Sequence, residues 1–445
     1  MKPKELLVYV EDQYCGVLRE DNRGKHSFEY DISVANPPQI SLSMPVRSEP
    51  WTGIAVEAYI DGILPDSRDM RQRIANLYGV NANNPFALLT AVGLDCAGGI
   101  QFVLPENAEN FRQESQLRPI DDKHIAERLR AISAARGPSW QIDDEHWSLN
   151  GAQDKIALQF NNGKWYEALG SAATTHIIKP GIDGLHEQAF NEYICMQTLH
   201  SLGIPVATSQ FHIFDGLPAI VSTRWDRARI SDDQGGTIIT RIHQEDMCQA
   251  TSHMTSEKYQ TDGGPSAIEI FKCIQDNDLG EDSSTLFLIA LILNFLMGGI
   301  DSHAKNYAIL EPAGKRPTLA PLYDIASIYA YEPLRKQRKL AMSIGGEYNY
   351  KRIDLRHWRN MSDAVSSDMF EFAKFFLQQY ALLLPDAFHQ TSLHALEQPA
   401  LQLTDQPAND ISLENRKILV QRIQAGINAQ CDRVLGWFGK PAMEF

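Results

Sequence analysis

One stretch of the chain, Leu286–Met297, is almost wholly apolar and constrains the fold more than any other feature. It has twelve residues and is interrupted by Asn294, which leaves it well short of the roughly 20 residues that a membrane-spanning helix needs. The sequence therefore predicts a helix buried in a protein core. A polar segment, Gly299–Asn306, follows closely, so the end of this buried helix is expected to anchor a loop of chemically active side chains.

The length and the change of pattern along the chain predict more than one folding unit. The chain has 445 residues, more than a single hydrophobic core usually organises. Strand-like patterns prevail up to about residue 240, and helical patterns follow. We expect an α+β fold with a β-rich N-terminal subdomain at 1–138, a small lobe at 139–225 and a mainly helical large lobe at 226–445.

Composition excludes several classes of protein. The formal net charge of -15 argues against broad, unaided binding to nucleic acid, because phosphate contacts need dense Lys and Arg. The six cysteines stand singly and form no CxxC pattern, so neither a zinc site nor a disulfide framework is indicated. Met1 leads directly into polar residues, so no secretory signal is expected and the protein is predicted to be cytoplasmic.

Turn residues and apolar periodicity place the other elements. Glu11–Gln13 predicts a hairpin turn, and Asn161–Gly163 predicts a type I′ turn between strands at 155–160 and 164–168. The polar stretch at about 105–122 is interpreted as a connector. Predicted helices cover 54–61, 67–78, 123–135, 187–202, 266–275, 284–299, 363–383 and 413–437.

The polar segment after the apolar helix predicts phosphoryl transfer. That reaction needs a carboxylate to accept the proton of the attacking hydroxyl and an oxygen ligand that helps to hold Mg²⁺. Protein kinases place an Asp and an Asn five residues apart on one loop for these roles, and Asp301 and Asn306 have this spacing. Because Asp and Asn are also common in polar loops at helix ends, this motif alone leaves a purely structural role open.

A second carboxylate strengthens the kinase interpretation. Tyr323 and Asp324 follow Asn306 after a short predicted strand at 308–310 and a turn. Kinases keep their main metal carboxylate at a strand end after the catalytic loop. We therefore predict Asp324 and Asn306 as the Mg²⁺ ligands and Asp301 as the catalytic base.

Two further segments are candidates for contacts to the phosphates of ATP. Lys179 ends a β-rich run and has the position of a strand lysine that reaches the α and β phosphates, held by Glu187 or, in our preferred reading, Glu192. Ser148–Lys155 contains a glycine turn that can aim backbone N–H groups at phosphate oxygens. The alternative for Lys179 is an exposed strand end without function, and the alternative for Ser148–Lys155 is a simple hairpin loop.

Two other side chains are candidates for contacts to the nucleotide. His303 has no second histidine at metal-ligand spacing, so a structural or nucleotide-contacting role is expected. Trp225, in the run Arg224–Arg227 where a hinge between lobes would fall, is placed to stack on adenine while the neighbouring backbone pairs with its edge. A core position for Trp225 remains an equal alternative.

The order of these segments resembles HipA, the serine/threonine kinase toxin of HipA–HipB toxin–antitoxin modules. The matching segments span nearly the whole chain, from about residue 5 to 360. They are Leu64–Ser67, Gly151–Lys155, Thr175–Lys179, Gln244–Gln249, Lys258–Tyr259, Asp262–Pro265, Asp301–Asn306, Tyr323–Ile325 and Leu340–Met342. The combination of Gln244–Gln249 with Asp301–Asn306 is specific to this family.

The resemblance implies a bilobal, protein-kinase-like fold that uses ATP and Mg²⁺. It implies inactivation by autophosphorylation of a loop serine, which maps to Ser148. It further implies a small helix-turn-helix antitoxin dimer as partner, joint occupancy of operator DNA that represses the operon, and protein targets such as aminoacyl-tRNA synthetases. The implied nucleotide contacts are Asn150, Gly151, Ala152, Gln153, Asp154, Lys155, Lys179, Thr223, Arg224, Trp225, Gln244, His303, Ala304, Lys305, Asn306, Tyr323 and Asp324.

Three positions depart from the family pattern. Ser302 stands where the best-known member has Gly, Thr223 replaces a hinge Glu, and Asn150 replaces an Ala. Thr223 puts a side-chain contact to the adenine or ribose in doubt. None of the three changes removes a catalytic group.

A basic run at 335–339, with further Lys and Arg up to residue 359, is the one dense positive segment. It is interpreted either as a solvated face or as an ancillary contact to operator phosphates while an antitoxin reads the sequence. Two other functions remain open at this point. One is a small-molecule kinase of the aminoglycoside or choline type, and the other is a non-catalytic protein that holds an antitoxin on DNA.

Overall fold

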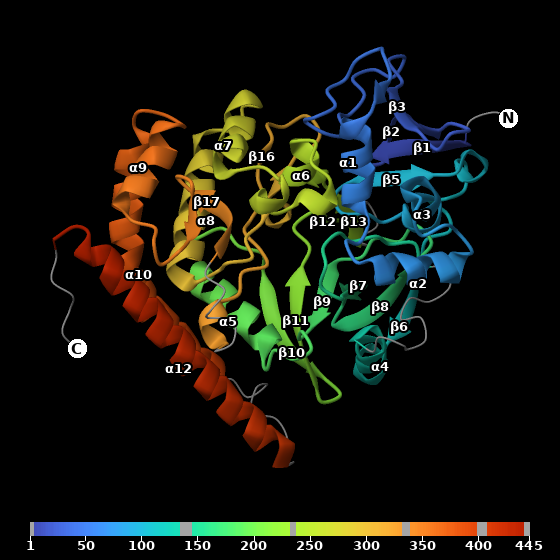
Figure 1. The fold of residues 1–445 in the computed structure, drawn as a ribbon. Coiled ribbons are helices and arrows are strands. Elements are labelled where there is room, and N and C mark those ends of the chain that lie inside the picture. The colour runs from blue at the N-terminus through green and yellow to red at the C-terminus, as the bar shows by residue number, and fades with distance from the viewer. Residues whose placement is uncertain (1–3, 134–144, 232–236, 332–338, 398–406, 440–445) are drawn as a thin grey trace. The chain divides into compact units, whose positions relative to one another are not determined.

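The structure is a computed structural model that describes residues 4–133, 145–231, 237–331, 339–397 and 407–439. The chain forms two compact units, each assembled from separate stretches. Figure 1 labels their helices and strands. Unit 1 combines Met1–Lys179, Thr223–Lys258 and Ala308–Ala320, and unit 2 combines Pro180–Ser222, Tyr259–Tyr307 and Pro321–Phe445. The sequence-based division at 1–138, 139–225 and 226–445 stays a prediction, because its first boundary lies outside the described residues.

Unit 1 holds most of the strands. Its helices are α1 (Ile54–Ile63), α2 (Arg68–Tyr78), α3 (Pro85–Val92), α4 (Asp122–Ser133) and α6 (Met247–Ala250). Its strands are β1 (Lys4–Val10), β2 (Gln13–Glu20), β3 (His26–Tyr30), β4 (Trp51–Thr52), β5 (Ile100–Val103), β6 (Gln116–Ile120), β7 (Ile156–Asn161), β8 (Lys164–Leu169), β9 (His176–Pro180), β12 (Arg227–Ser231), β13 (Thr237–Arg241), β14 (Gln244–Asp246), β15 (Ala308–Leu310) and β16 (Thr318–Leu319).

Unit 2 is mainly helical. Its helices are α5 (Gln188–Ser201), α7 (Ala267–Asp276), α8 (Glu281–Met297), α9 (Leu355–Asp363), α10 (Met369–Glu397) and α12 (Pro407–Gly436). Its strands form two hairpins, β10 (Ser209–Phe214) with β11 (Leu217–Thr223), and β17 (Lys339–Ile344) with β18 (Glu347–Asn349).

The predicted hairpins are confirmed. In the N-terminal sheet, ordered β4-β3-β2-β1-β5, the turn between β1 and β2 uses Glu11 and Asp12 at φ 47° and 66°. The turn between β7 and β8 uses Asn162 and Gly163 at φ 48° and 75°. A two-residue turn of type I′ needs positive φ at both central residues, which Asn and Gly tolerate best.

The apolar stretch is a buried helix, as predicted. Residues Phe287–Met297 of α8 are at most 8% exposed, and the helix ends at Gly298, which adopts a left-handed φ of 73°. This position suits glycine because a side chain there would be strained. None of the helices in the described ranges combines the length and hydropathy that a bilayer crossing requires.

Two sequence-based predictions are wrong in detail. The stretch at 105–122 is more than a connector, since β6 pairs with β8 from Gln116↔Leu169 to Ile120↔Trp165. Its residues are nearly all exposed and include Pro119, so no buried apolar face marks the strand in the sequence. Its existence depends on a partner strand about 50 residues away in the sequence.

The helix predicted at 363–383 is α10, which begins at Met369 and continues past Pro385 to Glu397, while the preceding α9 (Leu355–Asp363) was not predicted. Proline usually ends a helix because it lacks an N–H and clashes with the preceding turn. Here Leu384 and Phe388 on either side are both fully buried. Burial of this apolar face offsets the cost of a proline inside the helix. This burial is not evident from the sequence.

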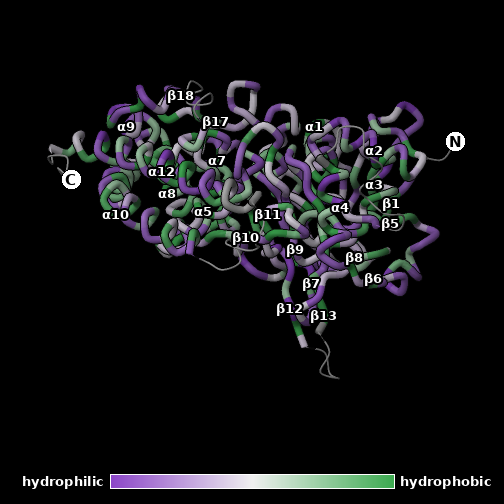
Figure 2. The backbone as a smooth tube through the Cα atoms, turned by 90° about the horizontal axis from the view of Figure 1, so that it is seen from below, coloured by the Kyte–Doolittle hydropathy of each residue, from purple (hydrophilic) through white to green (hydrophobic). Residues whose placement is uncertain are grey.

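The β12–β13 hairpin extends away from the rest of unit 1 (Figure 2). Its cross-strand pair Ile230↔Ile238 is about half exposed, at 48% and 47%. The end of the hairpin at Ile230 and Ile238 therefore adds little to the core of its unit.

Two buried carboxyl groups make the stability of unit 1 depend on pH. Glu245 on β14 and Glu311 next to β15 share a hydrogen bond, and burial raises the pKa of Glu311 to about 7 from an ordinary value of 4.5. Between these values the folded chain keeps a proton that the unfolded chain has released. The free energy of unfolding is therefore expected to fall by roughly 1 to 3 kcal/mol as pH rises through this window.

Urea unfolding of Glu311→Gln at pH 5 to 8 tests this expectation. The amide keeps a hydrogen bond to Glu245 without needing a proton, so the pH dependence should weaken, while the part due to Glu245, whose pKa burial also raises, should remain. Glu106→Gln, a change on the exposed surface, should keep the wild-type slope. An unchanged slope in Glu311→Gln would contradict the shared proton.

Candidate active site

The segment after α8 is fixed to the core of unit 2 by its backbone. Gly299 N–H donates to the Asn294 carbonyl (2.8 Å), and Ile300 carbonyl accepts from Ala341 N–H on β17 (3.0 Å). A Cβ on Gly299 would lie 2.1 Å from Asn294 Oδ1, so only glycine fits this close approach. The loop therefore leaves the buried helix in one defined direction.

Asp301 and Asn306 lie on one tight turn. The Asp301 carbonyl accepts from His303 N–H (2.8 Å) and from the Asn306 side-chain amide (2.9 Å). The Asp301 carboxylate is exposed, and its Oδ1 accepts from the Tyr259 hydroxyl (2.5 Å). In the described residues no group donates to Asp301 Oδ2 or to Asn306 Oδ1, which leaves both oxygens available to a ligand.

Asp324 belongs to a segment that is tied to this turn. The hydroxyl of Tyr323 donates to the Lys305 carbonyl (2.6 Å), and the adjacent Leu322 pairs with Val206. Asp324 has a φ of 60°, a left-handed conformation that non-glycine residues seldom adopt and that is often found at functional sites. Unit 2 thus brings the segments of Asp301, Asn306 and Asp324 together, in the sequence order that was predicted.

These oxygen donors fit a magnesium ion held jointly with a nucleotide. Mg²⁺ usually takes one or two carboxylates and completes its shell with phosphates and water. Asp324 and Asn306 supply one carboxylate and one amide oxygen of this kind. No cluster of three or more His, Cys, Asp or Glu that would bind a metal without a nucleotide occurs in the described ranges.

The other residues of this loop that are predicted to contact the nucleotide are buried within unit 2. Ala304, Lys305 and Asn306 form a short 3-10 helix whose side chains are at most 8% exposed. The His303 ring lies edge-on against Tyr259, with centroids 5.0 Å apart. The contact of His303 with nucleotide stays a prediction.

In unit 1, Ser148 is fully buried. Its hydroxyl donates to the Ile63 carbonyl (3.0 Å), its backbone N–H donates to the Asp95 carbonyl (3.0 Å), and the flanking Trp147 and Leu149 are each 4% exposed. The hydroxyl cannot reach a phosphate donor in this conformation. Phosphorylation of Ser148 requires that the segment leave its place.

The glycine turn after Ser148 is held by a clamp that the sequence did not reveal. Gly151 N–H donates to Asp66 Oδ1 (3.1 Å), and Lys258 Nζ donates to Asp66 Oδ2 (2.9 Å). Lys155 Nζ folds back onto the Asn150 carbonyl (2.5 Å). Asp66 and Lys258 both lie in family-like segments, but the sequence assigned no role to either residue.

The predicted hinge run is built on a buried ionic cluster. Arg224, Arg227 and Arg241 surround Asp95, with closest N–O distances of 2.9 to 3.4 Å. Burial would raise the pKa of Asp95, but the three guanidinium groups hold it well below its ordinary value. The cluster thus stays ionised and keeps the run in a single conformation.

Within this run, Trp225 and Gln244 contact each other. Trp225 Nε1 donates to Gln244 Oε1 (3.0 Å). The Arg224 N–H already donates to the Thr175 carbonyl (2.9 Å), and its guanidinium is engaged with Asp226 (2.7 Å). Of the predicted adenine contacts, Arg224 therefore retains only its carbonyl, while Thr223 is exposed at the end of β11.

The Gln244–Gln249 motif also anchors unit 1. Glu245 accepts from Ser41 Oγ (2.6 Å) and Leu42 N–H (2.7 Å). Asp246 caps α6 and accepts from the side chain of Asn150 (3.1 Å). The motif therefore links the glycine turn to the core, a role that was not evident from its sequence.

Lys179 and its candidate carboxylates are found in different units. Lys179 on β9 is 8% exposed and Glu192 on α5 is 2% exposed. Glu187 accepts from Arg416 Nε (2.8 Å) and Ser412 Oγ (2.8 Å), so its carboxylate already has partners. The choice of Glu192 as the partner of Lys179 stays a prediction.

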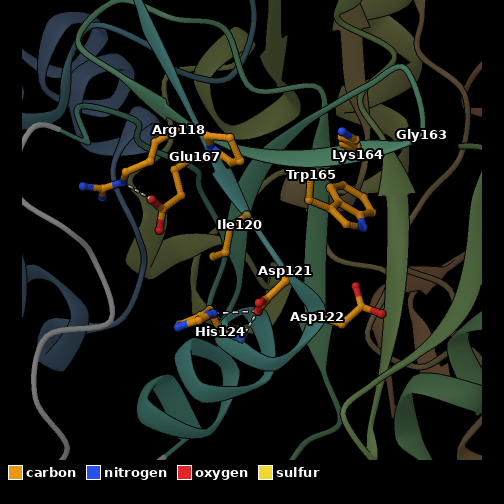
Figure 3. A pocket seen from close by; sticks show the side chains of 10 residues that line it. Arg118, Ile120, Asp121, Asp122, His124, Gly163, Lys164, Trp165 and Glu167 are labelled. Carbon is orange, nitrogen blue, oxygen red and sulfur yellow. Dashed lines mark hydrogen bonds and ion pairs between the residues drawn. The ribbon is translucent and has the colours of Figure 1, made fainter.

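A pocket of about 820 Å³ lies on unit 1, between β6, β8 and the start of α4 (Figure 3). Arg118 pairs there with Glu167 (2.5 Å), and His124 pairs with Asp121 (2.6 Å). Because Asp122 adds a further carboxylate, these walls are a poor match for a triphosphate. None of the predicted site residues lines this pocket.

Comparison with protein families decides the assignment. A model of the HipA N-terminal domain matches residues 6–103, and a model of the HipA-like C-terminal domain matches residues 147–383, more than half of the chain. The chain belongs to the HipA family. The family resemblance inferred from the motifs is thereby confirmed.

Individual relatives agree with this family. The chain is 32% identical over 370 residues to Y4mE of Sinorhizobium fredii, which is named as a kinase. The match covers 81% of this chain and 86% of that protein. It is 31% identical over 315 residues to the serine/threonine-protein kinase toxin HipA of Shewanella oneidensis, covering 67% and 68%. By this membership the HipA-family chain is an enzyme of the serine/threonine kinase class.

A solved structure supports the fold. The complex of Shewanella oneidensis HipA with HipB and operator DNA contains a chain that matches with a TM-score of 0.78 over 98% of both chains, at 24% identity. The α+β class predicted from the sequence is therefore confirmed.

Proposed function

We propose that this HipA-family chain is an ATP- and Mg²⁺-dependent serine/threonine protein kinase that acts as the toxin of a toxin–antitoxin module. The observation that carries the proposal is the arrangement in unit 2, where one turn presents Asp301 and Asn306 and the hydroxyl of Tyr323 ties the segment of Asp324 to the same turn. Both oxygens needed for the chemistry, Asp301 Oδ2 and Asn306 Oδ1, accept no bond in the described residues.

Asp301 acts as the base of the reaction. Its Oδ2 accepts the proton of a serine or threonine hydroxyl as that oxygen attacks phosphorus, which raises the nucleophilicity of the attacking group. The turn holds the main chain of Asp301 by two hydrogen bonds to one carbonyl. These bonds fix the place from which the side chain starts, and such positioning of the main chain contributes to preorganisation of the base.

When bound, Mg·ATP supplies the transferable phosphoryl group and neutralises its charge. Asn306 Oδ1 and Asp324 are the proposed ligands for the metal ion. Lys179, the turn at Asn150–Lys155, and the run Thr223–Trp225 with Gln244 are the proposed nucleotide contacts of unit 1. In unit 2 the corresponding contacts are His303, Ala304, Lys305 and Tyr323.

Autophosphorylation of Ser148 is the proposed off-switch. A phosphate adds roughly -1.5 to -2 charges, and the buried position of Ser148 between Trp147 and Leu149 offers no solvation for them. The modified segment must therefore stay outside its docked position. The adjoining turn at Asn150–Lys155 would then no longer be held where the nucleotide contact is proposed.

The proposed partners follow from the family. The Shewanella oneidensis complex contains HipB and operator DNA, and we propose that a small helix-turn-helix dimer of this kind binds this chain and carries it to its operator. The net charge of -15 fits DNA contact made mainly by the antitoxin. Most of the basic run at 335–339 lies outside the described residues, so its contact with DNA stays a prediction. The protein target is proposed to be of the aminoacyl-tRNA synthetase class.

Labelled ATP separates these proposals from the alternatives. The full chain with Mg²⁺, γ-labelled ATP and a cell lysate should transfer label to serine or threonine of proteins, and EDTA should abolish the transfer. A parallel panel of aminoglycosides, choline and other small alcohols should stay unlabelled. Label confined to the small alcohols, or no Mg²⁺-dependent transfer at all, would contradict the proposal.

A further inference from the structure

We propose that Tyr259 is a positioning residue for the base Asp301, holding one carboxylate oxygen so that the other faces the substrate hydroxyl. This inference rests on the proposed function. It adds a residue outside the catalytic turn, for which neither the sequence motifs nor the kinase pattern assigned any role.

The hydrogen bond between the two side chains is short and asymmetric. The Tyr259 hydroxyl donates to Asp301 Oδ1 at 2.5 Å, as expected for an O–H group bonded to a carboxylate. Among the described residues it is the one donor to that carboxylate. Because the phenol occupies Oδ1 alone, Oδ2 stays open to a second hydroxyl.

Asp301 needs this support because its side chain is exposed. The turn fixes the main chain of Asp301 through its carbonyl, but these bonds leave the side-chain torsions free. An exposed carboxylate without a partner samples several rotamers, and only some of them aim an oxygen at the substrate. A base that is misplaced by about 1 Å loses roughly 100-fold in rate.

Tyr259 is itself held in place, so it can transmit order to Asp301. Its carbonyl accepts from Asp262 N–H (2.9 Å) and Gly264 N–H (3.1 Å). Its ring lies edge-on against His303 at an interplanar angle of 87°, and His303 is only 5% exposed. The phenol therefore approaches the base from a rigid turn and is braced by a buried residue of the catalytic loop.

The alternative role for Tyr259 is that its phenol blocks the base in the absence of substrate. A phenol that merely fills the place of the substrate hydroxyl must leave whenever substrate binds. The contact between the Tyr259 ring and His303 opposes such a movement. The two roles predict changes of opposite sign when the hydroxyl is removed, so one substitution distinguishes them.

Tyr259→Phe removes the hydroxyl and keeps the ring against His303. We expect kcat for protein phosphorylation to fall about 10- to 100-fold, the effect of losing one hydrogen bond to a charged group, while KM for ATP changes less than about twofold. Tyr380→Phe on α10 is the matched control and should retain wild-type kcat. An unchanged or raised kcat in Tyr259→Phe would overturn the inference.

Two further measurements separate positioning from general loss of structure. Replacing Tyr259 with fluorotyrosines of graded phenol acidity keeps the shape, so kcat should vary steadily with acidity at constant KM; a flat series refutes the role. Tyr259→Phe should also cause no additional loss when Asp301→Asn is already present, and an additive loss refutes it. If wild type and Asp301→Asn both lack transfer activity, the proposed function fails instead.

Discussion

Asp301→Asn is expected to lower phosphoryl transfer about 100- to 10,000-fold, the usual contribution of a positioned general base. The amide has the shape of the carboxylate and can still accept from Tyr259, so the turn should remain intact. It cannot take up the proton of the substrate hydroxyl. The rate should be measured under single-turnover conditions with γ-labelled ATP, together with the dissociation constant for the nucleotide.

The dissociation constant for Mg·ATP distinguishes loss of the base from loss of nucleotide binding. Because Asn306 and Asp324 are unchanged, the dissociation constant for Mg·ATP should stay within about threefold of wild type, an energy difference below about 1 kcal/mol. Asp276→Asn at the exposed end of α7 should leave both quantities at the wild-type level. Transfer by Asp301→Asn at the wild-type rate would remove Asp301 as the base.

Incubation with Mg·ATP is expected to inactivate the wild-type chain, and Ser148→Ala is expected to stay active. A phosphate on Ser148 cannot return to a site where the hydroxyl donates to the Ile63 carbonyl between two buried apolar side chains, because an unpaired buried charge costs far more than the segment gains by docking. We expect activity to fall at least about tenfold as one phosphate is incorporated. Mass spectrometry of the Trp147-containing peptide locates the phosphate.

Hydrogen exchange shows whether the physical cause is correct. The peptide over 146–152 should lose protection on phosphorylation, while the peptides of α8 keep theirs. Ser171→Ala, another buried serine of unit 1, should become inactivated like wild type. Phosphate on a different residue, or full activity of the chain phosphorylated at Ser148, would contradict the off-switch.

The sequence was most informative where chemistry and local structure coincide. Asp301 and Asn306 follow a helix whose burial is evident from its apolar sequence. The Tyr323–Asp324 segment lies beside their turn, as predicted. The Asn162–Gly163 turn was equally readable, because its backbone conformation depends on those two residues alone. These features need no knowledge of distant contacts.

Long-range partners account for what the sequence did not show. Asp66, Asp95 and Tyr259 acquire their roles from groups 42 to 192 residues away, and no local pattern distinguishes them from other polar residues. The same holds for β6, whose strand is defined by pairing with β8. The continuation of α10 through Pro385 likewise depends on burial of Leu384 and Phe388, since local propensity alone ends the helix there.

Anomalous diffraction from crystals grown with Mn²⁺ and a non-hydrolysable ATP analogue tests the central claim most directly. We expect a metal ion about 2.1 Å from Asn306 Oδ1 and from a carboxylate oxygen of Asp324, with Asp301 Oδ2 left open towards the γ-phosphate. An ion bound to other residues, or carboxylates of Asp301 and Asp324 that face different cavities, would contradict it.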